Sequence, residues 1–214
     1  MNYLAHLLLA QREAKTLLGA LMGDFRKHVD VRELPEAILR GMEHHRAVDR
    51  YTDSHPLVRN LKSLFSQQRR RYAGIIIDIS FDHFLSRHWQ LFSAEHRSEF
   101  IDYVYDCLRQ CRTSMPPRMQ QAMHYMIQED WLGSYLELAG VESSLNRLSR
   151  RIRFQNNLHG AIEEVAENYS ELERGFLEFF PQLQLYARPL ATTATLSEST
   201  LVTETGCQPT FHLV

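Results

Sequence analysis

The chain has 214 residues, of which 44% are hydrophobic and 23% are charged, the ordinary composition of a globular protein. This length suits one substantial hydrophobic core and is short for two, so we expect a single domain. The formal net charge of -2 argues against a general nucleic-acid-binding protein.

Helical periodicity runs through almost every segment up to about Pro189, and no stretch shows the sustained period-two alternation of a half-buried strand. We therefore predict an all-α protein, a compact bundle of about eight helices in one domain over residues 1–189. In the first half we expect helices over residues 2–11, 13–27 and 35–52, and from about residue 56. Pro35 suits the first turn of its helix, where a missing N–H costs nothing, and Asn2 is a suitable N-cap.

The second half contains the most apolar helix and the clearest packing seam. Residues 75–89 predict a buried central helix, followed by helices over 94–111 and 119–127 and by short helices near Trp131, Leu136 and Leu145. A last long helix has apolar residues at alternating spacings of four and three, typical of a packing seam: Leu158, Ile162, Val165, Tyr169, Leu172, Phe176 and Phe179. Residues 190–214 lack periodicity and are rich in small polar side chains, so we expect a disordered tail.

The central helix gives the first indication of function, because Asp78 and Asp82 lie one turn apart on it. At i and i+4 the two carboxylates point the same way, among apolar neighbours such as Ile79 and Phe81 that indicate burial. A buried ionised carboxylate is costly, so it normally neutralises, pairs with a cation or coordinates a metal. We therefore expect a cation beside this helix, held in part by another segment.

Three other positions offer side chains that bind a divalent cation. His45 and Asp49 form a second i, i+4 pair, and imidazole with carboxylate on one helix face can chelate a hard or borderline ion. His6 lies on the apolar first helix, and Asp24 follows Gly23. Each has a plainer interpretation: the pair as a solvated ion pair, His6 as a hydrogen-bonded core histidine, and Asp24 as a turn residue. The same ligand types recur on separate segments, and this recurrence favours the interpretation as a metal site.

The cysteines and the apolar runs bear on location. Cys107, Cys111 and Cys207 form no C-x-x-C motif and are odd in number, which favours a reducing compartment and argues against a thiolate zinc site. The apolar run at residues 7–9 is short and has no basic leader, unlike a signal peptide. No segment approaches the roughly 20 apolar residues needed to cross a bilayer. We therefore expect a cytoplasmic protein.

Motifs along most of the chain carry a family resemblance. They are Met1-Asn2 with Leu4-Ala5-His6-Leu7, Gly23-Asp24-Phe25, His45-Arg46 with Asp49, Thr52-Asp53, Asp78, and the block from Asp82 to Trp89. In this order they resemble the bacterial acyl carrier protein phosphodiesterases, a divergent branch of the all-helical HD phosphohydrolases. The resemblance extends from the first residue to about Phe180-Pro181. The adjacent His-Asp pair that names the HD superfamily is reversed here, as Asp82-His83.

The resemblance implies hydrolysis of the phosphodiester between 4′-phosphopantetheine and a serine of holo acyl carrier protein, which releases the apo protein and free 4′-phosphopantetheine. It also implies an HD-like fold and a divalent metal, Mn²⁺ first and Mg²⁺ next, while histidine ligands leave Fe²⁺ and Zn²⁺ open. The metal ligands are then expected among His6, Asp24, His45, Asp49, Asp78 and Asp82.

This reaction needs one group that orients the attacking water and another that protonates the departing serine oxygen. We expect Asp82 or Asp24 in the first role. We expect His83 or His45 in the second. The sequence does not decide between the members of each pair.

Arginines are the expected contacts for the substrate. Arg46 is placed to bind a phosphate oxygen, or equally to pair with Asp49. Acyl carrier proteins are small and strongly acidic, so a protein that acts on them needs a local basic surface. Two clusters offer one: Arg69, Arg70 and Arg71 before the central helix, and Arg147, Arg150, Arg151 and Arg153 later in the chain. The plainer interpretation is that both clusters are solvated helix ends.

Three rival functions stay open at this point. An HD-type nucleotide phosphohydrolase would use similar ligands on a small phosphate ester. A carboxylate-bridged redox protein in a helical bundle would need paired Glu-x-x-His motifs, and the sequence has none. A non-catalytic module would dock an acidic partner through its arginines and bind no metal. We expect neither nucleic acid nor membrane as a partner.

Overall fold

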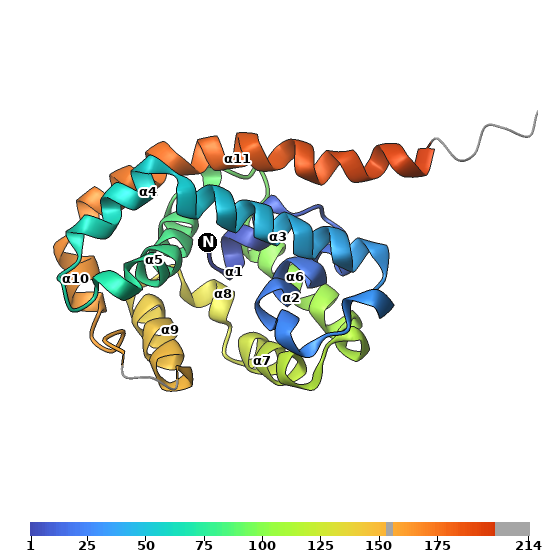
Figure 1. Cartoon of the computed structure of the whole chain (residues 1–214), viewed down its shortest axis with the longest axis horizontal. Coiled ribbons are helices and arrows are strands. Elements are labelled where there is room, and N and C mark those ends of the chain that lie inside the picture. The colour runs from blue at the N-terminus through green and yellow to red at the C-terminus, as the bar shows by residue number, and fades with distance from the viewer. Residues whose placement is uncertain (153–155, 200–214) are drawn as a thin grey trace, which may run out of the picture.

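Every regular element in residues 1–152 and 156–199, the part of the chain that the computed structural model describes, is a helix (Figure 1). This confirms the all-α prediction. The α-helices are α1 (Tyr3–Leu9), α2 (Ala14–Met22), α3 (Glu36–Ser54), α4 (Pro56–Leu61), α5 (Ala73–Arg87), α6 (Arg97–Gln110), α7 (Pro117–Gln128), α8 (Trp131–Ser134), α9 (Leu138–Arg151), α10 (Ile162–Glu167) and α11 (Tyr169–Ser199). Their number in these residues exceeds the prediction because several are short: α8 has four residues, and α4 and α10 have six each.

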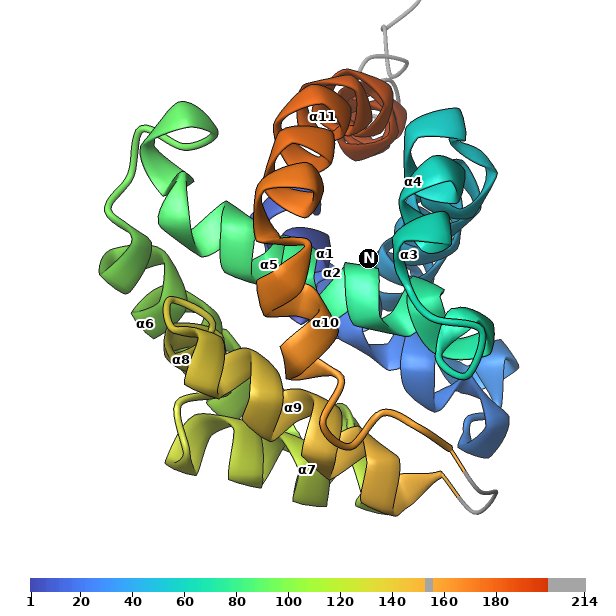
Figure 2. The ribbon, with the colours of Figure 1, turned by 90° about the vertical axis from the view of Figure 1, so that its left-hand side faces the viewer.

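Helix α5 lies inside the molecule, where α1, α9 and α11 contact it (Figures 1 and 2). Its side chains Ile76, Phe81 and Phe84 are completely buried. Burying one such side chain contributes roughly 1.5–3 kcal/mol, so this helix is a large part of the hydrophobic core. The prediction of a buried central helix is confirmed, with bounds two residues earlier at each end.

Helices α2 and α3 pack along each other, and two glycines let their backbones approach closely. A Cβ at Gly19 would overlap the carbonyl oxygen of Ile38, and a Cβ at Gly41 would overlap the carbonyl oxygen of Thr16. This close crossing holds α3 against the buried α2. It therefore sets the position of the second half of α3, which carries His45 and Asp49.

Helix α11 runs across α3, α4 and α5 (Figure 1). Its apolar stripe faces the core. Leu172, Phe176 and Phe179 of the predicted seam are completely buried. The seam is not one helix, however, because α10 ends at Glu167 and α11 begins at Tyr169. Asn168 lies between them and its side-chain amide donates to the carbonyl oxygen of Glu164, a local bond that competes with helix continuation.

Helix α11 also continues beyond Pro189 to Ser199, where the sequence predicted a disordered tail from residue 190. A proline inside a helix removes one hydrogen bond and strains the preceding turn, but a helix that is already formed can continue past it. The same helix also contains Pro181. The rest of the predicted tail, residues 200–214, lies outside the described residues. Among the residues described, neither α11 nor any other helix combines the length and apolarity that crossing a membrane requires.

The α2–α3 crossing can be tested by adding a single methyl group. We expect Gly41→Ala to lower the free energy of unfolding by about 1–3 kcal/mol, because the helices must move apart to admit the Cβ. Gly74→Ala near the start of α5 is the matched control, since its Cβ would lie 3.6 Å from Lys62 Cε in ordinary contact. The control should stabilise by about 0.5–1 kcal/mol through helix propensity. Equal effects in urea unfolding would contradict the close crossing.

Candidate metal centre

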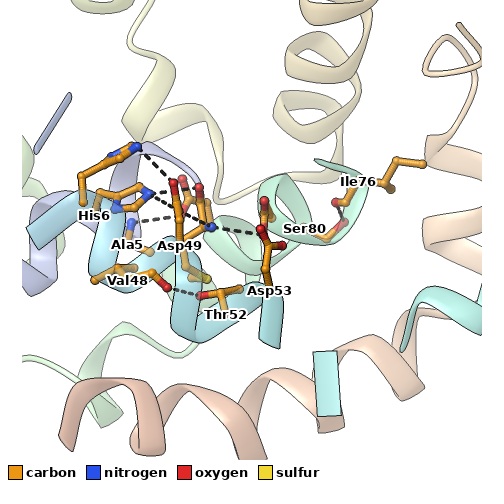
Figure 3. A network of polar contacts seen from close by, with 12 residues as sticks. Ala5, His6, Val48, Asp49, Thr52, Asp53, Ile76 and Ser80 are labelled. Atoms are coloured by element: carbon orange, nitrogen blue, oxygen red, sulfur yellow. Dashed lines mark hydrogen bonds and ion pairs between the residues drawn. The ribbon is translucent and has the colours of Figure 1, made fainter. Parts of the chain in front are cut away.

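Two histidines and one aspartate from distant segments meet at one place. His6 comes from α1, while His45 and Asp49 share one face of α3 through their i, i+4 spacing. One ligand atom of each lies within 4.8 Å of the others. His6 Nε2 is 3.0 Å from Asp49 Oδ1 (Figure 3). His45 Nε2 is 3.1 Å from Asp49 Oδ2. The two imidazole rings stack with their centroids 4.0 Å apart. We call these three residues the ligand cluster.

Burial and hydrogen bonding set the protonation of the ligand cluster. Burial lowers the pKa of His6 to about 3, so its ring is neutral at neutral pH. Burial acts to raise the pKa of Asp49, but hydrogen bonds from His45 and His6 outweigh it and hold this pKa well below its usual range. Burial also acts to lower the pKa of His45, but Asp49 and Asp24 outweigh it and raise this pKa. His45 therefore holds a proton more tightly than an ordinary histidine.

Two more of the predicted ligands, Asp24 and Asp78, lie at the edge of the ligand cluster. Asp24 Oδ1 is 3.7 Å from His45 Nε2. The α-ammonium of Met1 lies 3.2 Å from Asp49 Oδ1 and 3.2 Å from Asp78 Oδ1. Burial acts to lower the pKa of this ammonium, but the charges of Asp78 and Asp49 outweigh it and raise the pKa to about 10. The positive charge of this α-ammonium therefore lies between Asp49 and Asp78, two of the carboxylates from which the sequence analysis predicted a bound cation.

Gly23 packs directly against the imidazole of His45. A Cβ at this position would overlap ring atom Cδ2. Gly23 begins the 3-10 helix Gly23–His28, which also carries Asp24. A glycine here therefore lets the turn that bears Asp24 approach His45. The motif Gly23-Asp24-Phe25 marked the position in the sequence, but nothing in the sequence gave the steric reason.

Asp82 contacts α1 and not the ligand cluster. Its Oδ2 accepts the backbone N–H of Leu4 at 2.8 Å, and its Oδ1 accepts the N–H of Ala5 at 3.0 Å. These amides belong to the first turn of α1, which has no acceptors of its own for them. The Asp82 side chain is completely buried, and burial raises its pKa to about 7 although both amide bonds act to lower it. Both oxygens of this predicted ligand are thus engaged by the fold.

His83, the other predicted proton donor, also has partners away from the ligand cluster. Its Nδ1 lies 2.9 Å from the carbonyl oxygen of Tyr135, and its Nε2 lies 3.0 Å from the hydroxyl of Tyr169. The ring is buried where α5 meets the segments that carry these tyrosines. The structure thus brings His45, and not His83, to the cluster.

Arg46 follows His45 on α3 and is half-buried.

The first arginine cluster is largely engaged by the fold. Arg69 Nη1 forms an ion pair with Glu164 Oε1 at 2.7 Å. Arg70 donates to two backbone carbonyl oxygens in the segment just before it. Arg71 is exposed, and its guanidinium lies 6.0 Å from the ring centroid of Tyr72. These contacts tie the segment before α5 to the rest of the molecule, so much of the charge is used internally.

The second arginine cluster lies beside the candidate site. A cavity of about 600 Å³ is lined by Met1, Asp24 and Asp78 on one side and by Arg151 of α9 on another. Arg150 is exposed on the same helix, and Arg153 lies outside the described residues. The cavity gives Asp24 and Asp78 access to solvent, with 51% and 27% of their side chains exposed. A substrate can therefore reach the carboxylates at the edge of the ligand cluster.

The ligand cluster has the donor set of a divalent metal site. Imidazole nitrogen suits ions such as Zn²⁺ and Fe²⁺, and carboxylate oxygen suits Mn²⁺ and Mg²⁺. His6 Nδ1 is buried and has no hydrogen-bond partner among the described residues. Only the Nε2 atoms face Asp49 and the cluster. Two nitrogen atoms and one carboxylate, with more carboxylates nearby and a cavity alongside, fit an ion that keeps positions open for water or substrate.

The sequence matches known proteins along most of its length. Residues 1–183 match the family model described as acyl carrier protein phosphodiesterase. The protein of that name from Serratia proteamaculans is 35% identical over 197 residues, covering 88% of this chain and 98% of the relative. Those from Enterobacter sp. and Escherichia coli O157:H7 are 33% and 32% identical, covering 88% and 87% of this chain and 98% and 97% of the relatives. No solved structure gives a significant match.

The contact between Asp82 and α1 predicts a large loss of stability on truncation. We expect Asp82→Ala to lower the free energy of unfolding by about 2–4 kcal/mol, because two buried amides lose their acceptor and a cavity is left. Asp106→Ala is the matched control: this exposed residue of α6 pairs only with Arg109, so the change should stay within about 0.5 kcal/mol. Chemical unfolding monitored by circular dichroism measures both. Similar stabilities for the two variants would refute the role given to Asp82.

Proposed function

The chain belongs to the acyl carrier protein phosphodiesterase family, and on that premise we propose that it hydrolyses the phosphodiester between 4′-phosphopantetheine and a serine of holo acyl carrier protein. The products are the apo protein and free 4′-phosphopantetheine. One observation carries this proposal: ligand atoms of His6, His45 and Asp49 meet within 4.8 Å, beside a cavity of about 600 Å³. A metal-binding donor set next to space for a substrate suits phosphodiester hydrolysis, because a bound divalent ion would neutralise phosphoryl charge and activate water.

The proposal places a divalent ion on the ligand cluster, with Mn²⁺ favoured over Mg²⁺. Mg²⁺ is usually bound through one or two carboxylates and water, whereas two imidazole nitrogens suit a softer ion. Asp24 and Asp78 are then the members of the predicted ligand set that lie next to the ion. When bound, such an ion neutralises charge on phosphoryl oxygens and lowers the pKa of a coordinated water.

Asp24 is the carboxylate that we assign to the attacking water. Asp78 is paired with the α-ammonium of Met1, and Asp49 already contacts both imidazoles. Asp24 lies 3.7 Å from His45, lines the cavity and has half of its side chain exposed. A water that donates a hydrogen bond to Asp24 is held beside the cluster, and its proton passes to the carboxylate as the oxygen attacks phosphorus. As the bond from phosphorus to the serine oxygen breaks, Asp24 gives this proton to the departing oxygen, so that the step ends with the serine hydroxyl and an ionised carboxylate.

His45 is assigned as a ligand and not as a proton donor. A ring nitrogen that coordinates a metal cannot also carry a proton, so the two roles expected from the sequence exclude each other at Nε2. Nε2 is the atom that faces Asp49 and Asp24. His45 must therefore lose its proton when the ion binds.

Asp82 is proposed as a positioning residue. It holds the first turn of α1 through the amides of Leu4 and Ala5, and α1 carries His6 into the ligand cluster. Its effect on turnover would therefore come through the position of His6.

We also propose a cytoplasmic location, because Cys107 and Cys111 are both free thiols.

Turnover should depend on metal and on His45. Incubated with Mn²⁺, the purified protein should remove from holo acyl carrier protein a mass equal to 4′-phosphopantetheine, and a chelator should stop the reaction. His45→Ala should lower kcat/KM by more than about 100-fold, because losing a ligand costs more than losing a residue that merely supports one. His96→Ala is the matched control, since this exposed side chain makes no cap to α6. An unchanged mass in metal-loaded wild-type samples would contradict the proposed reaction.

Metal binding should release a proton. Because the pKa of His45 is raised by Asp49 and Asp24, the ion must displace a proton there, so Mn²⁺ affinity should fall as pH drops through this pKa. At 100 times its dissociation constant, Mn²⁺ should add about 2.7 kcal/mol to the free energy of unfolding. Calorimetry in two buffers of different ionisation enthalpy counts the proton, and Asp49→Asn should abolish the stabilisation. Tight binding without proton release would exclude His45 as a ligand.

A further inference from the structure

Arg151, near the C-terminus of α9, lies where three hollows of the molecule meet. It lines the cavity that contains Asp24 and Asp78. It also lines a small pocket of about 50 Å³ beside Tyr3. Finally, it lines a groove of about 640 Å³ between α7 and α9, both of which lie below α5 in Figure 2. Because they share Arg151, the three hollows adjoin one another, and we call this row, from the cavity beside Asp24 to the groove along α7, the path.

The groove at the outer end of this path is basic. Its lining contains the three arginines Arg118, Arg147 and Arg151 and a single acidic residue, Glu129. It also contains Tyr125, which is 44% exposed although its ring is large and mostly apolar. Arginine and tyrosine are two of the residues most enriched where proteins bind each other. The cavity at the inner end differs, because its titratable side chains include two aspartates.

The arginines of this groove are held in place by the fold. The Arg147 guanidinium lies 3.5 Å from the ring centroid of Trp131 and donates to Ser144 Oγ at 3.0 Å. It also contacts Glu129 at 3.2 Å, so that acid is already partly neutralised. Arg151 donates to the hydroxyl of Tyr3 and remains exposed. Arginine side chains that are already held in one conformation lose less conformational entropy when a partner binds.

We propose that the groove between α7 and α9, with Arg118, Arg147 and Arg151, is the surface on which the acidic carrier protein docks, and that Arg151 stands where the substrate phosphodiester passes into the cavity. This inference rests on the proposed function. An acidic partner is repelled by the aspartates around the ligand cluster and attracted by the arginines beyond it, so it binds beside the cavity and extends its phosphodiester inwards.

The groove is also a better docking surface than the first arginine cluster. Arg69 is committed to Glu164, and Arg70 to backbone carbonyl oxygens. Neither residue lines the cavity beside Asp24, whereas Arg151 lines both the cavity and the groove. A partner bound in the groove therefore lies next to the cavity where the reaction is proposed, whereas a partner bound at the first arginine cluster does not.

Binding of labelled apo acyl carrier protein, measured by fluorescence anisotropy, tests the groove apart from catalysis, because the apo protein keeps its acidic surface and has no phosphodiester. Arg118→Glu and Arg151→Glu should each weaken binding by about 10-fold or more, with less dependence on salt than the wild type. Arg118 is exposed in the first turn of α7, where glutamate suits the helix dipole, so this variant should fold. Arg32→Glu makes the same charge change at an 85% exposed side chain outside the groove and should bind as the wild type does.

The same variants with holo acyl carrier protein separate the two proposals. A raised KM with little change in kcat for Arg118→Glu supports docking in the groove. Wild-type hydrolysis together with wild-type binding by both groove variants would overturn the docking proposal and leave the proposed function standing. A larger loss for Arg71→Glu than for Arg118→Glu would overturn it too, in favour of the first arginine cluster. Absence of both binding and hydrolysis in the wild type would refute the function itself, and the docking surface with it.

Discussion

The buried contact between Asp82 and the first amides of α1 is the interaction on which the candidate site depends. A helix of seven residues is too short to be stable alone, so α1 needs partners for its N-terminal amides and its apolar face. Asp82, in the middle of α5, accepts hydrogen bonds from two of these amides, those of Leu4 and Ala5. Because α1 carries His6 and begins just after Met1, the same contact places an imidazole and the α-ammonium beside α3. The scaffold and the site are therefore joined through one carboxylate.

The ligand cluster concentrates polar groups in a part of the molecule that is otherwise apolar. Asp49 is the acceptor that His6, His45 and the α-ammonium share. Among the described residues, the Nδ1 atom of His6 is buried without a partner. An unpaired buried polar group costs about 1–3 kcal/mol, so this arrangement lowers stability and must be offset by the surrounding core.

Periodicity in the sequence predicted the helices, the burial of α5 and the pairing of His45 with Asp49, because i, i+4 neighbours share a helix face. It also placed His6 among the ligand types. It gave no sign of the contact between Asp82 and α1, since the partners of that carboxylate are backbone N–H groups, which every residue except proline has and no motif marks. The contact of Gly23 with His45 depends on a space between two segments, which the sequence does not encode locally. Arg69 looked free for the same reason, because its partner Glu164 is far along the chain.

Acidic and basic side chains of this protein lie in separate regions, which its net charge of -2 does not reveal. Carboxylates gather around the ligand cluster, where a cation is required, and three arginines line the groove beyond it. A phosphodiester carried by an acidic protein presents negative charge twice, once at the reacting group and once on the surface of its carrier. A single basic surface would hold both but would also neutralise the carboxylates to which we assign metal binding and the attacking water. The two aspartates lie on the turn after α2 and on α5, whereas the arginines lie on α7 and α9, so each charge of the substrate can meet its own complement.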